Sequence, residues 1–102
     1  MTAEIADAWL PAFYTAGAAQ DVWGKSLAAG AAKRDPNRAP LEIFAGGMVA
    51  IGEGMEPMRD LARPGAALYI GGMGARSKNF YNDIFSKSGY EAEAKLIQDL
   101  YL

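Results

Sequence analysis

The chain has 102 residues, of which 51% are hydrophobic and 22% charged, and its net charge is −2. This length is typical of one compact domain with enough apolar material for a core, so we treat residues 1–102 as one domain. The chain contains no cysteine and no histidine. Thiol chemistry and disulfides are therefore excluded, and the most common general base and metal ligand are missing, so we expect no metal site.

The basic residues are scattered along the chain, and their densest group, Lys33, Arg34 and Arg38, is interrupted by Asp35. This pattern is typical of a solvated helix end and turn, so we expect no nucleic-acid partner. No apolar run approaches the roughly 18 residues that a membrane span needs, and the first residues lack the basic segment of a signal peptide. The sequence therefore predicts no membrane partner and a cytoplasmic location.

Two apolar runs in the first half of the chain predict strands. Residues 8–14 form a short aromatic-rich run that Pro11 ends or leads into a loop. Residues 41–51 form a continuous run, as in a strand covered on both faces, in which Gly46 and Gly47 indicate a bulge or a close approach to the backbone. Between them, apolar residues at helical spacing predict a helix over residues 18–33.

The next segment is predicted to contain a helix followed by another apolar stretch. Pro57 opens a helix at a position where proline is tolerated, and Pro64 interrupts it. Another apolar stretch, residues 66–70, is ended by Gly71 and Gly72.

Two helices are predicted at the end of the chain. The first covers residues 79–88 and is stopped by Gly89, and the second covers residues 91–102. The residues expected to share the inner face of the second helix are Ala92, Leu96, Ile97, Leu100 and Tyr101.

This order of elements predicts an α/β fold in which a strand, a helix and a second strand form a crossover with parallel strands. Two parallel strands do not form a stable sheet alone. The sequence therefore predicts that the strands need neighbours that these residues do not supply.

Several segments resemble the later part of luciferase-like oxidoreductases, in the branch dependent on coenzyme F-420, a deazaflavin. They are ALYIGGMG at residues 67–74, NFYN at 79–82, IQDLYL at 97–102 and EIADAWLP at 4–11. The resemblance implies an incomplete (β/α)8 TIM barrel in which residues 1–102 supply about strands 6–7 and the following helices. A whole barrel needs about 250 residues or more, so about a third of it is present.

The resemblance also implies an oxidoreductase or monooxygenase that acts by hydride transfer or oxygenation with coenzyme F-420 or FMN. In the full-length enzyme it implies a small-molecule substrate and a possible homodimer. The fragment alone is expected to be inactive and not to bind the cofactor tightly.

The site implied by the resemblance lies at the carboxyl ends of the strands. Trp9, Pro11 and Phe13 are candidates for a pocket around the cofactor ring or the substrate, and the alternative is that the aromatic rings pack in the core.

A second candidate site is the glycine-rich segment after residue 70. Gly72, Gly74 and Arg76 are candidates for contacts to the anionic tail of a cofactor, and the alternative is a helix-breaking turn. No residue in the sequence qualifies as a catalytic acid, base or nucleophile. An alternative function for the whole chain is a small non-enzymatic α/β interaction module that pairs its open sheet edge with a partner.

Overall fold

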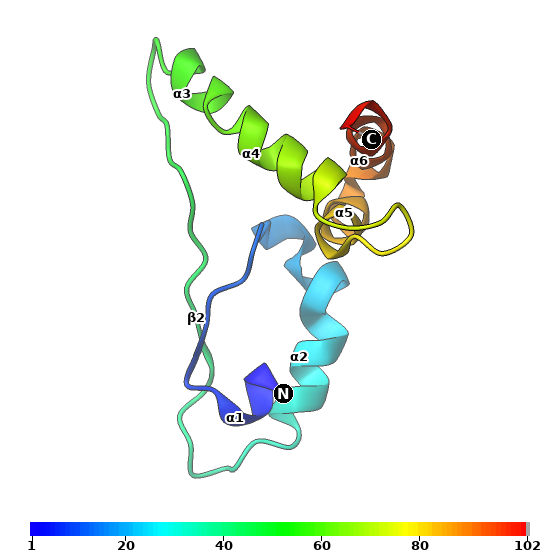
Figure 1. Ribbon diagram of the computed structural model, residues 1–102. Coiled ribbons are helices and arrows are strands. Elements are labelled where there is room, and N and C mark those ends of the chain that lie inside the picture. The colour runs from blue at the N-terminus through cyan, green and yellow to red at the C-terminus, as the bar shows by residue number, and fades with distance from the viewer. Residues whose placement is uncertain (102) are drawn as a thin grey trace. The chain divides into compact units, whose positions relative to one another are not determined.

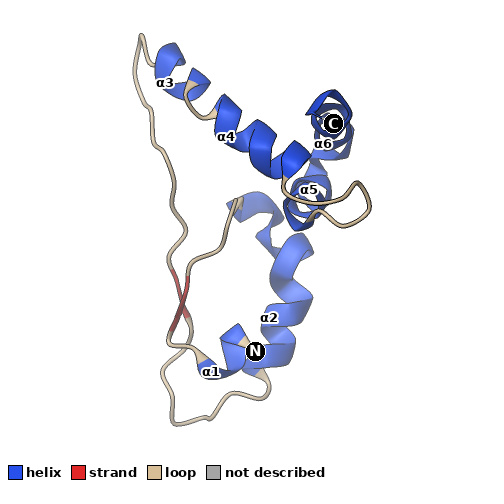
Figure 2. Ribbon diagram, in the orientation of Figure 1, coloured by secondary structure: helices blue, strands red, loops and turns tan. Residues whose placement is uncertain are grey.

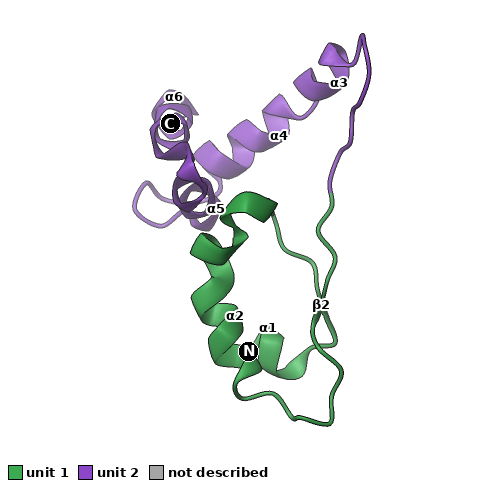
Figure 3. Ribbon diagram, turned by 180° about the vertical axis from the view of Figure 1, so that it is seen from behind, with its two compact units in different colours: residues 1–46 green, residues 47–102 purple. Residues whose placement is uncertain are grey.

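The computed structural model describes residues 1–101 and divides the chain into two compact units, the first being residues 1–46 and the second beginning at Gly47 (Figure 3). The sequence predicted one domain, and in the structure its residues form two compact units. Each unit is described by itself below.

The first unit contains the predicted strand–helix–strand crossover (Figures 1 and 2). The two strands are parallel, with Ala8 opposite Glu42 and Trp9 opposite Ile43. The parallel pairing predicted from the sequence is therefore confirmed, and α2 falls within the range predicted for the helix between the strands, while the helical turns before it begin at Ala16. The elements in chain order are α1 (Thr2–Ile5), β1 (Ala8–Trp9), the 3-10 turn η1 (Ala16–Ala18), the π-helical turn η2 (Gln20–Gly24), α2 (Lys25–Ala31) and β2 (Glu42–Ile43).

Both strands are much shorter than predicted. β1 ends at Trp9 because Pro11 cannot donate a backbone hydrogen bond and Phe13 has a positive φ of 52°. Beyond the end of β1, the segment after β2 makes one more backbone hydrogen bond to it, from Phe44 N to Trp9 O at 2.9 Å. The chain from there to residue 51 forms no regular structure. The prediction of one continuous strand over residues 41–51, covered on both faces, was wrong.

The glycine pair in this segment shows neither a bulge nor a close approach. No atom lies within 4 Å of the positions where Cβ atoms would stand at Gly46 and Gly47. The boundary between the two compact units falls between these two residues.

In the first unit, α1 packs closely on α2. A Cβ at Gly30 would lie 2.8 Å from the Cβ of Ala3, which is closer than side-chain contacts allow, so the glycine is required for this approach. Ala3 is itself 6% exposed and belongs to the core.

Two arginines hold the carboxyl end of α1. Arg34 donates from Nη1 to the carbonyl oxygens of Ala3 and Ala6, at 3.1 and 2.8 Å. Arg38 donates from Nη1 to Ile5 O at 2.7 Å. Cations at the carboxyl end of a helix satisfy carbonyls that have no partner within the helix. The basic group predicted to be a solvated helix end therefore has a structural role.

The second unit is helical, and the helix start predicted at Pro57 and the helix break predicted at Gly89 are confirmed. Pro57 and Pro64 each lie in the first turn of a helix, and Gly89 adopts a φ of 96° that breaks the helical path. Its elements are α3 (Glu56–Asp60), α4 (Arg63–Ala67), the π-helical turn η3 (Leu68–Gly72), α5 (Phe80–Phe85), the π-helical turn η4 (Ser86–Tyr90) and α6 (Glu91–Tyr101).

The predicted inner face of α6 was right for Ile97 and Tyr101, which meet the groove and η3, and wrong for the two leucines. Ala94 and Gln98 are 1% and 7% exposed, whereas Leu96 and Leu100 are 59% and 80% exposed. α6 packs on η3, where small residues let the helices approach, and this contact turns the two leucines outward. The choice of face is thus made by the packing partner and not by hydrophobicity alone. Leu102, predicted to end this helix, lies outside the described residues.

Candidate functional site

Three aromatic side chains gather at the carboxyl end of β1. The Trp9 ring lies edge-on to Trp23, with 5.2 Å between ring centroids, and edge-on to Tyr14 at 6.4 Å. Tyr14 and Trp23 are stacked, with an interplanar angle of 3° and centroids 5.7 Å apart. Such arrangements stabilise aromatic pairs by about 0.5–1.5 kcal/mol beyond the burial of area. The Trp9 ring is therefore packed against other rings of its own unit.

Pro11 and Phe13 form the turn that follows β1. Phe13 has a φ of 52°, in the left-handed region that bulky side chains rarely adopt, and its side chain is 36% exposed. Strained backbone of this kind persists where the surrounding structure enforces it, and it is concentrated at functional sites. The turn presents this ring at the end of the sheet where parallel α/β folds place their ligands.

The glycine-rich segment after residue 70 makes close contacts within the second unit. Cβ atoms at Gly71 and Gly72 would lie 2.5 and 2.4 Å from atoms of the Tyr101 side chain. Gly74 has a φ of 151°, and a Cβ there would lie 2.5 Å from Lys78 O. These glycines allow a close approach to α6 and a tight turn, and Gly71 and Gly72 lie inside η3.

Arg76 pairs with a carboxylate of α6. Its Nη1 donates to Asp99 Oδ1, and Lys95 Nζ lies 2.5 Å from Asp99 Oδ2. Hydrogen bonds from Lys95 and then Arg76 lower the pKa of Asp99 below its ordinary value of 3.8. The guanidinium proposed for anion binding is thus already engaged by an anionic side chain.

Two asparagines of the NFYN segment form a hydrogen-bond network that was not predicted from the sequence. Asn79 is 1% exposed; its Oδ1 accepts from the backbone N–H groups of Tyr81 and Asn82, and its Nδ2 donates to the carbonyls of Tyr69 and Ile70. The side chain therefore caps α5 and binds the carbonyls of η3 at the same time.

Asn82 extends the network to a third helical segment, since its Nδ2 donates to Ile70 O at 3.1 Å and to Ala94 O at 3.0 Å. An asparagine directly before a helical run, followed by a second one three residues later, was the available sequence signal.

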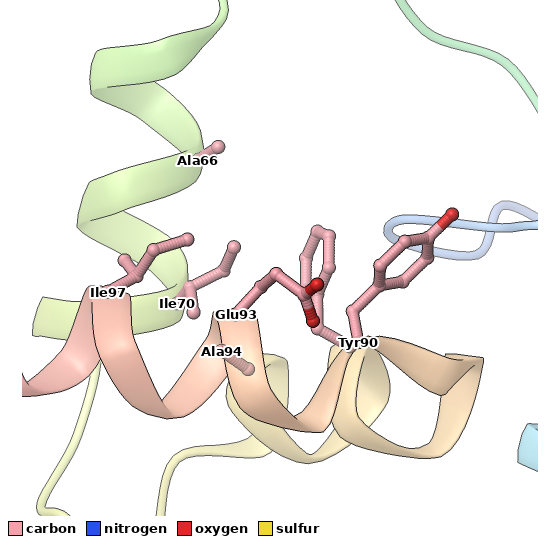
Figure 4. Close-up of a pocket in the computed structure, with 7 residues that line it drawn as sticks. Ala66, Ile70, Tyr90, Glu93, Ala94 and Ile97 are labelled. Atoms are coloured by element: carbon pink, nitrogen blue, oxygen red, sulfur yellow. The ribbon is translucent and has the colours of Figure 1, made fainter.

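An apolar groove of about 270 Å³ opens on the second unit between α4, η3 and α6 (Figure 4). Figure 4 shows side chains from these helices directed toward the same space. One charged residue, Glu93, lines it, so its surface suits an apolar group. The lining residues are Ala66, Ile70, Phe85, Tyr90, Glu93, Ala94 and Ile97.

A similar groove of about 240 Å³ lies on the first unit. Its lining is apolar except for Arg34, whose guanidinium is bonded to backbone carbonyls. The lining residues are Ala3, Leu27, Ala31, Arg34, Pro40, Leu41 and Ile43.

Several of the candidate cofactor residues contact other residues of their own unit. The aromatic rings beside β1 contact one another, the glycines contact Tyr101, and Arg76 contacts Asp99. Across residues 1–101, no group of three or more acidic side chains comes together as a metal site. No helix in this part of the chain is long and apolar enough to cross a membrane.

Comparison with known proteins defines the class of the chain. The sequence profile of the luciferase-like monooxygenase family matches residues 1–102, so the chain belongs to this family. A Mycobacterium tuberculosis protein named "Putative coenzyme F420-dependent oxidoreductase" is 37% identical in an alignment over 93 residues that covers 88% of this chain. The chain covers 26% of that relative's length. No solved structure matches the chain.

Proposed function

We propose that the chain is one part of a luciferase-like oxidoreductase whose complete (β/α)8 barrel uses coenzyme F-420 or FMN. The family membership and the similarity to a relative named as F420-dependent support this proposal. When bound, such a cofactor supplies hydride transfer or, as a reduced flavin, activation of oxygen. The chain contributes about the sixth and seventh strands and the helices that follow.

The observation that carries the proposal is the pair of parallel strands joined by α2. A strand, a helix and a parallel strand make the repeating unit of a (β/α)8 barrel. Two strands of two residues each do not make a stable sheet, so both outer edges need neighbours. In a barrel, the adjoining strands supply these neighbours.

The exposed surface of the chain agrees with missing neighbours. Its accessible area is 7479 Å². A compact monomer of 10.9 kDa exposes roughly 5,600 Å², and two separate compact units sharing this mass would together expose roughly 6,700 Å². In the proposed barrel, further strands and helices would cover exposed surface of this kind.

In the complete enzyme, Trp9, Pro11 and Phe13 would form part of the pocket wall for the substrate or the cofactor ring. The strained turn at Phe13 lies after β1, at the end of the sheet where barrel enzymes bind their ligands. Gly72, Gly74 and Arg76 would contact the cofactor tail if the complete protein redirects Arg76 from its carboxylate partner. Proton transfer would fall to residues outside this chain, because we expect no catalytic acid or base in its sequence.

Cofactor titration of the isolated chain tests the proposal. We expect no saturable change in the fluorescence of F-420 or FMN up to about 100 µM protein, because a weak, incomplete site has a dissociation constant well above the micromolar range. Saturable binding at low micromolar concentration would contradict it. Reading the coding sequence on both sides of these residues is the companion test, and further in-phase strand–helix units are expected there.

A second candidate function, a small non-enzymatic interaction module, is favoured by the exposed outer edge of β2. Ile43 and Phe44 are 43% and 57% exposed there. A sheet edge of this kind is a ready template for pairing with another strand. A sharp, cooperative melt of a stable monomer, together with genuine start and stop signals in the coding sequence, would favour the module over the barrel part.

A further inference from the structure

We propose that Leu10 and Phe44 form an apolar wall of the substrate pocket in the complete barrel, and that they determine which hydrocarbon group of a substrate the pocket accepts. The inference rests on the proposed function, because the other strands of the barrel complete this pocket. The directions of the side chains on β1 and β2 support it.

The side chain of Trp9 identifies the face of β1 that the helices cover. Its ring lies edge-on to that of Trp23, which belongs to η2, the turn that leads into α2. Successive side chains of a strand point to opposite faces. Leu10 keeps this alternation, because the residue before a proline, here Pro11, is restricted to extended backbone. The side chain of Leu10 therefore points away from the helices.

The side chains of β2 alternate in the same way. Ile43 lines the groove of the first unit together with Leu27 and Ala31 of α2, so its side chain faces the helices. The N–H group of Phe44 still donates to Trp9 O, at 2.9 Å, so the pairing of the strands extends to this residue. Phe44 therefore points to the opposite face from Ile43.

Leu10 and Phe44 are neighbours on the face away from the helices. Trp9 lies opposite Ile43 in the parallel register, and the same register continued by one residue places Leu10 opposite Phe44. Opposite residues of paired strands share a face of the sheet. The ring contact of Trp9 and the groove at Ile43 thus assign the helix-covered face independently, and the two assignments agree.

The face away from α2 becomes the interior of the proposed barrel. In a (β/α)8 barrel the helices form the outer ring, and side chains on the other face of each strand point inward. Inward side chains at the carboxyl ends of the strands border the ligand site, whereas those further back fill the packed core. Leu10 directly precedes Pro11, and Phe44 is the last residue bonded to β1, so both lie at carboxyl ends. Trp9 supports this wall from behind.

The chemistry of the wall suits a hydrocarbon group. The side chains of Leu10 and Phe44 offer no hydrogen-bond donor or acceptor, and Pro11 has no backbone N–H. The ring of a flavin or deazaflavin carries carbonyl and nitrogen atoms along its edge, and the tail of such a cofactor is anionic. The wall therefore matches an alkyl or aryl group of the substrate better than it matches the cofactor. Glu42 shares this face but lies two residues earlier, toward the packed core.

Straight-chain alcohols from butanol to decanol serve as probes of the pocket. Their dissociation constants are measured through the fluorescence of F-420 or FMN bound to the full-length enzyme that contains this chain. Affinity should rise about fourfold for each added methylene until the pocket is filled. Leu10→Ala and Phe44→Ala should each move this limit to alcohols that are longer by about two carbons, because both remove apolar volume. A limit that both variants leave unchanged would overturn the proposal.

Two further variants assign the effect to the wall. Ile43→Val is the matched control, since it shortens a helix-facing side chain of the same strand and should leave the limit unchanged. Leu10→Met nearly conserves the side-chain volume and should keep the limit of the unmodified enzyme. The cofactor dissociation constant should stay within about twofold in all variants, as expected for residues that do not touch the cofactor. A loss of cofactor affinity in Leu10→Ala with an unchanged limit would place Leu10 at the cofactor and overturn the proposal.

Engineered disulfides test the shared face without a cofactor. The chain contains no cysteine, so a disulfide between two of its residues can only join introduced thiols. Leu10→Cys with Phe44→Cys should form this bond on mild oxidation, because opposite residues of paired strands lie within the roughly 4.4–6.8 Å between Cα atoms that a disulfide spans. Leu10→Cys with Ile43→Cys should not form it, since these side chains point to opposite faces.

Mass spectrometry of the digested full-length protein measures the yield of each disulfide. Absence of the first bond, or equal yields of the two, would overturn the proposal. The two proposals can fail separately: a full-length protein that binds neither F-420 nor FMN would contradict the proposed function, whereas bound cofactor with an unchanged alcohol limit would contradict only the role of the wall.

Discussion

Replacing Asn79 with alanine should destabilise the second unit more than any other single polar substitution in the network. The side chain is 1% exposed and makes four hydrogen bonds. Loss of the cap on α5 costs about 1 kcal/mol. Loss of the two bonds from Nδ2 to the carbonyls of Tyr69 and Ile70 costs about 0.5–1.5 kcal/mol for each bond. The sum is about 2–4 kcal/mol.

Urea unfolding followed by circular dichroism at 222 nm measures this loss as a lower midpoint at unchanged slope. Asn79→Asp separates the two roles, because the carboxylate still caps α5 but cannot donate to the carbonyls of η3. Asn37→Ala, at an exposed turn position, serves as the matched control and should change stability by less than about 0.5 kcal/mol. A loss below that limit for Asn79→Ala would refute the role assigned to the network.

Three further predictions test other contacts. Gly71→Ala should lower the free energy of unfolding in urea by about 1–3 kcal/mol, because the new Cβ would lie 2.5 Å from Tyr101. Gly65→Ala is the control: a Cβ there would have no neighbour within 4 Å, so the change should be neutral or stabilise by up to about 1 kcal/mol. Equal effects of the two substitutions would contradict the assigned packing. Arg34→Ala should destabilise the first unit by about 1–3 kcal/mol, since it leaves carbonyls of α1 without their donor; no change in the midpoint would contradict this. The pKa of Asp99 is lowered below 3.8, so its ion pairs stabilise the fold at pH values above 3.8, and this stabilisation is lost as the pH falls through the lowered pKa. Asp99→Asn should therefore be less stable than the unmodified chain near neutral pH and equally stable at pH values below the lowered pKa. A stability difference that persists at low pH would show that the ion pairs do not cause it.

The helical parts of the fold were predictable because their signals are local. Pro57 and Pro64 start helices, and Gly89 interrupts one at a positive φ, as their backbone preferences require. The parallel pairing was also predictable, since a strand–helix–strand order of this length leaves few other topologies.

The lengths of the strands and the inner face of α6 were not predictable, because both depend on packing partners. β2 pairs only as far as β1 runs, and β1 ends two residues before Pro11. Leu96 is exposed, whereas the buried residues of α6 are Ala94 and Gln98, a small and a polar residue that a hydrophobic pattern would not select.

The candidate site shows the same division between local and tertiary signals. The positions of Trp9 and Phe13 at the end of the first strand followed from the order of elements. The partners of Arg76 and Gly72 did not, because Asp99 and Tyr101 lie more than 20 residues further along the chain and nothing in the sequence links them.

The most direct test of the account is amide exchange at Phe44, whose N–H donates to Trp9 O. In the dilute isolated chain, we expect protection of less than about 100-fold, because a two-residue ladder without neighbours is marginal. In a longer polypeptide that supplies the remaining barrel strands, protection of the same amide should rise toward the global stability of the protein. Full protection in the dilute isolated chain would show that the sheet is complete, and it would contradict the assignment of this chain to part of a barrel.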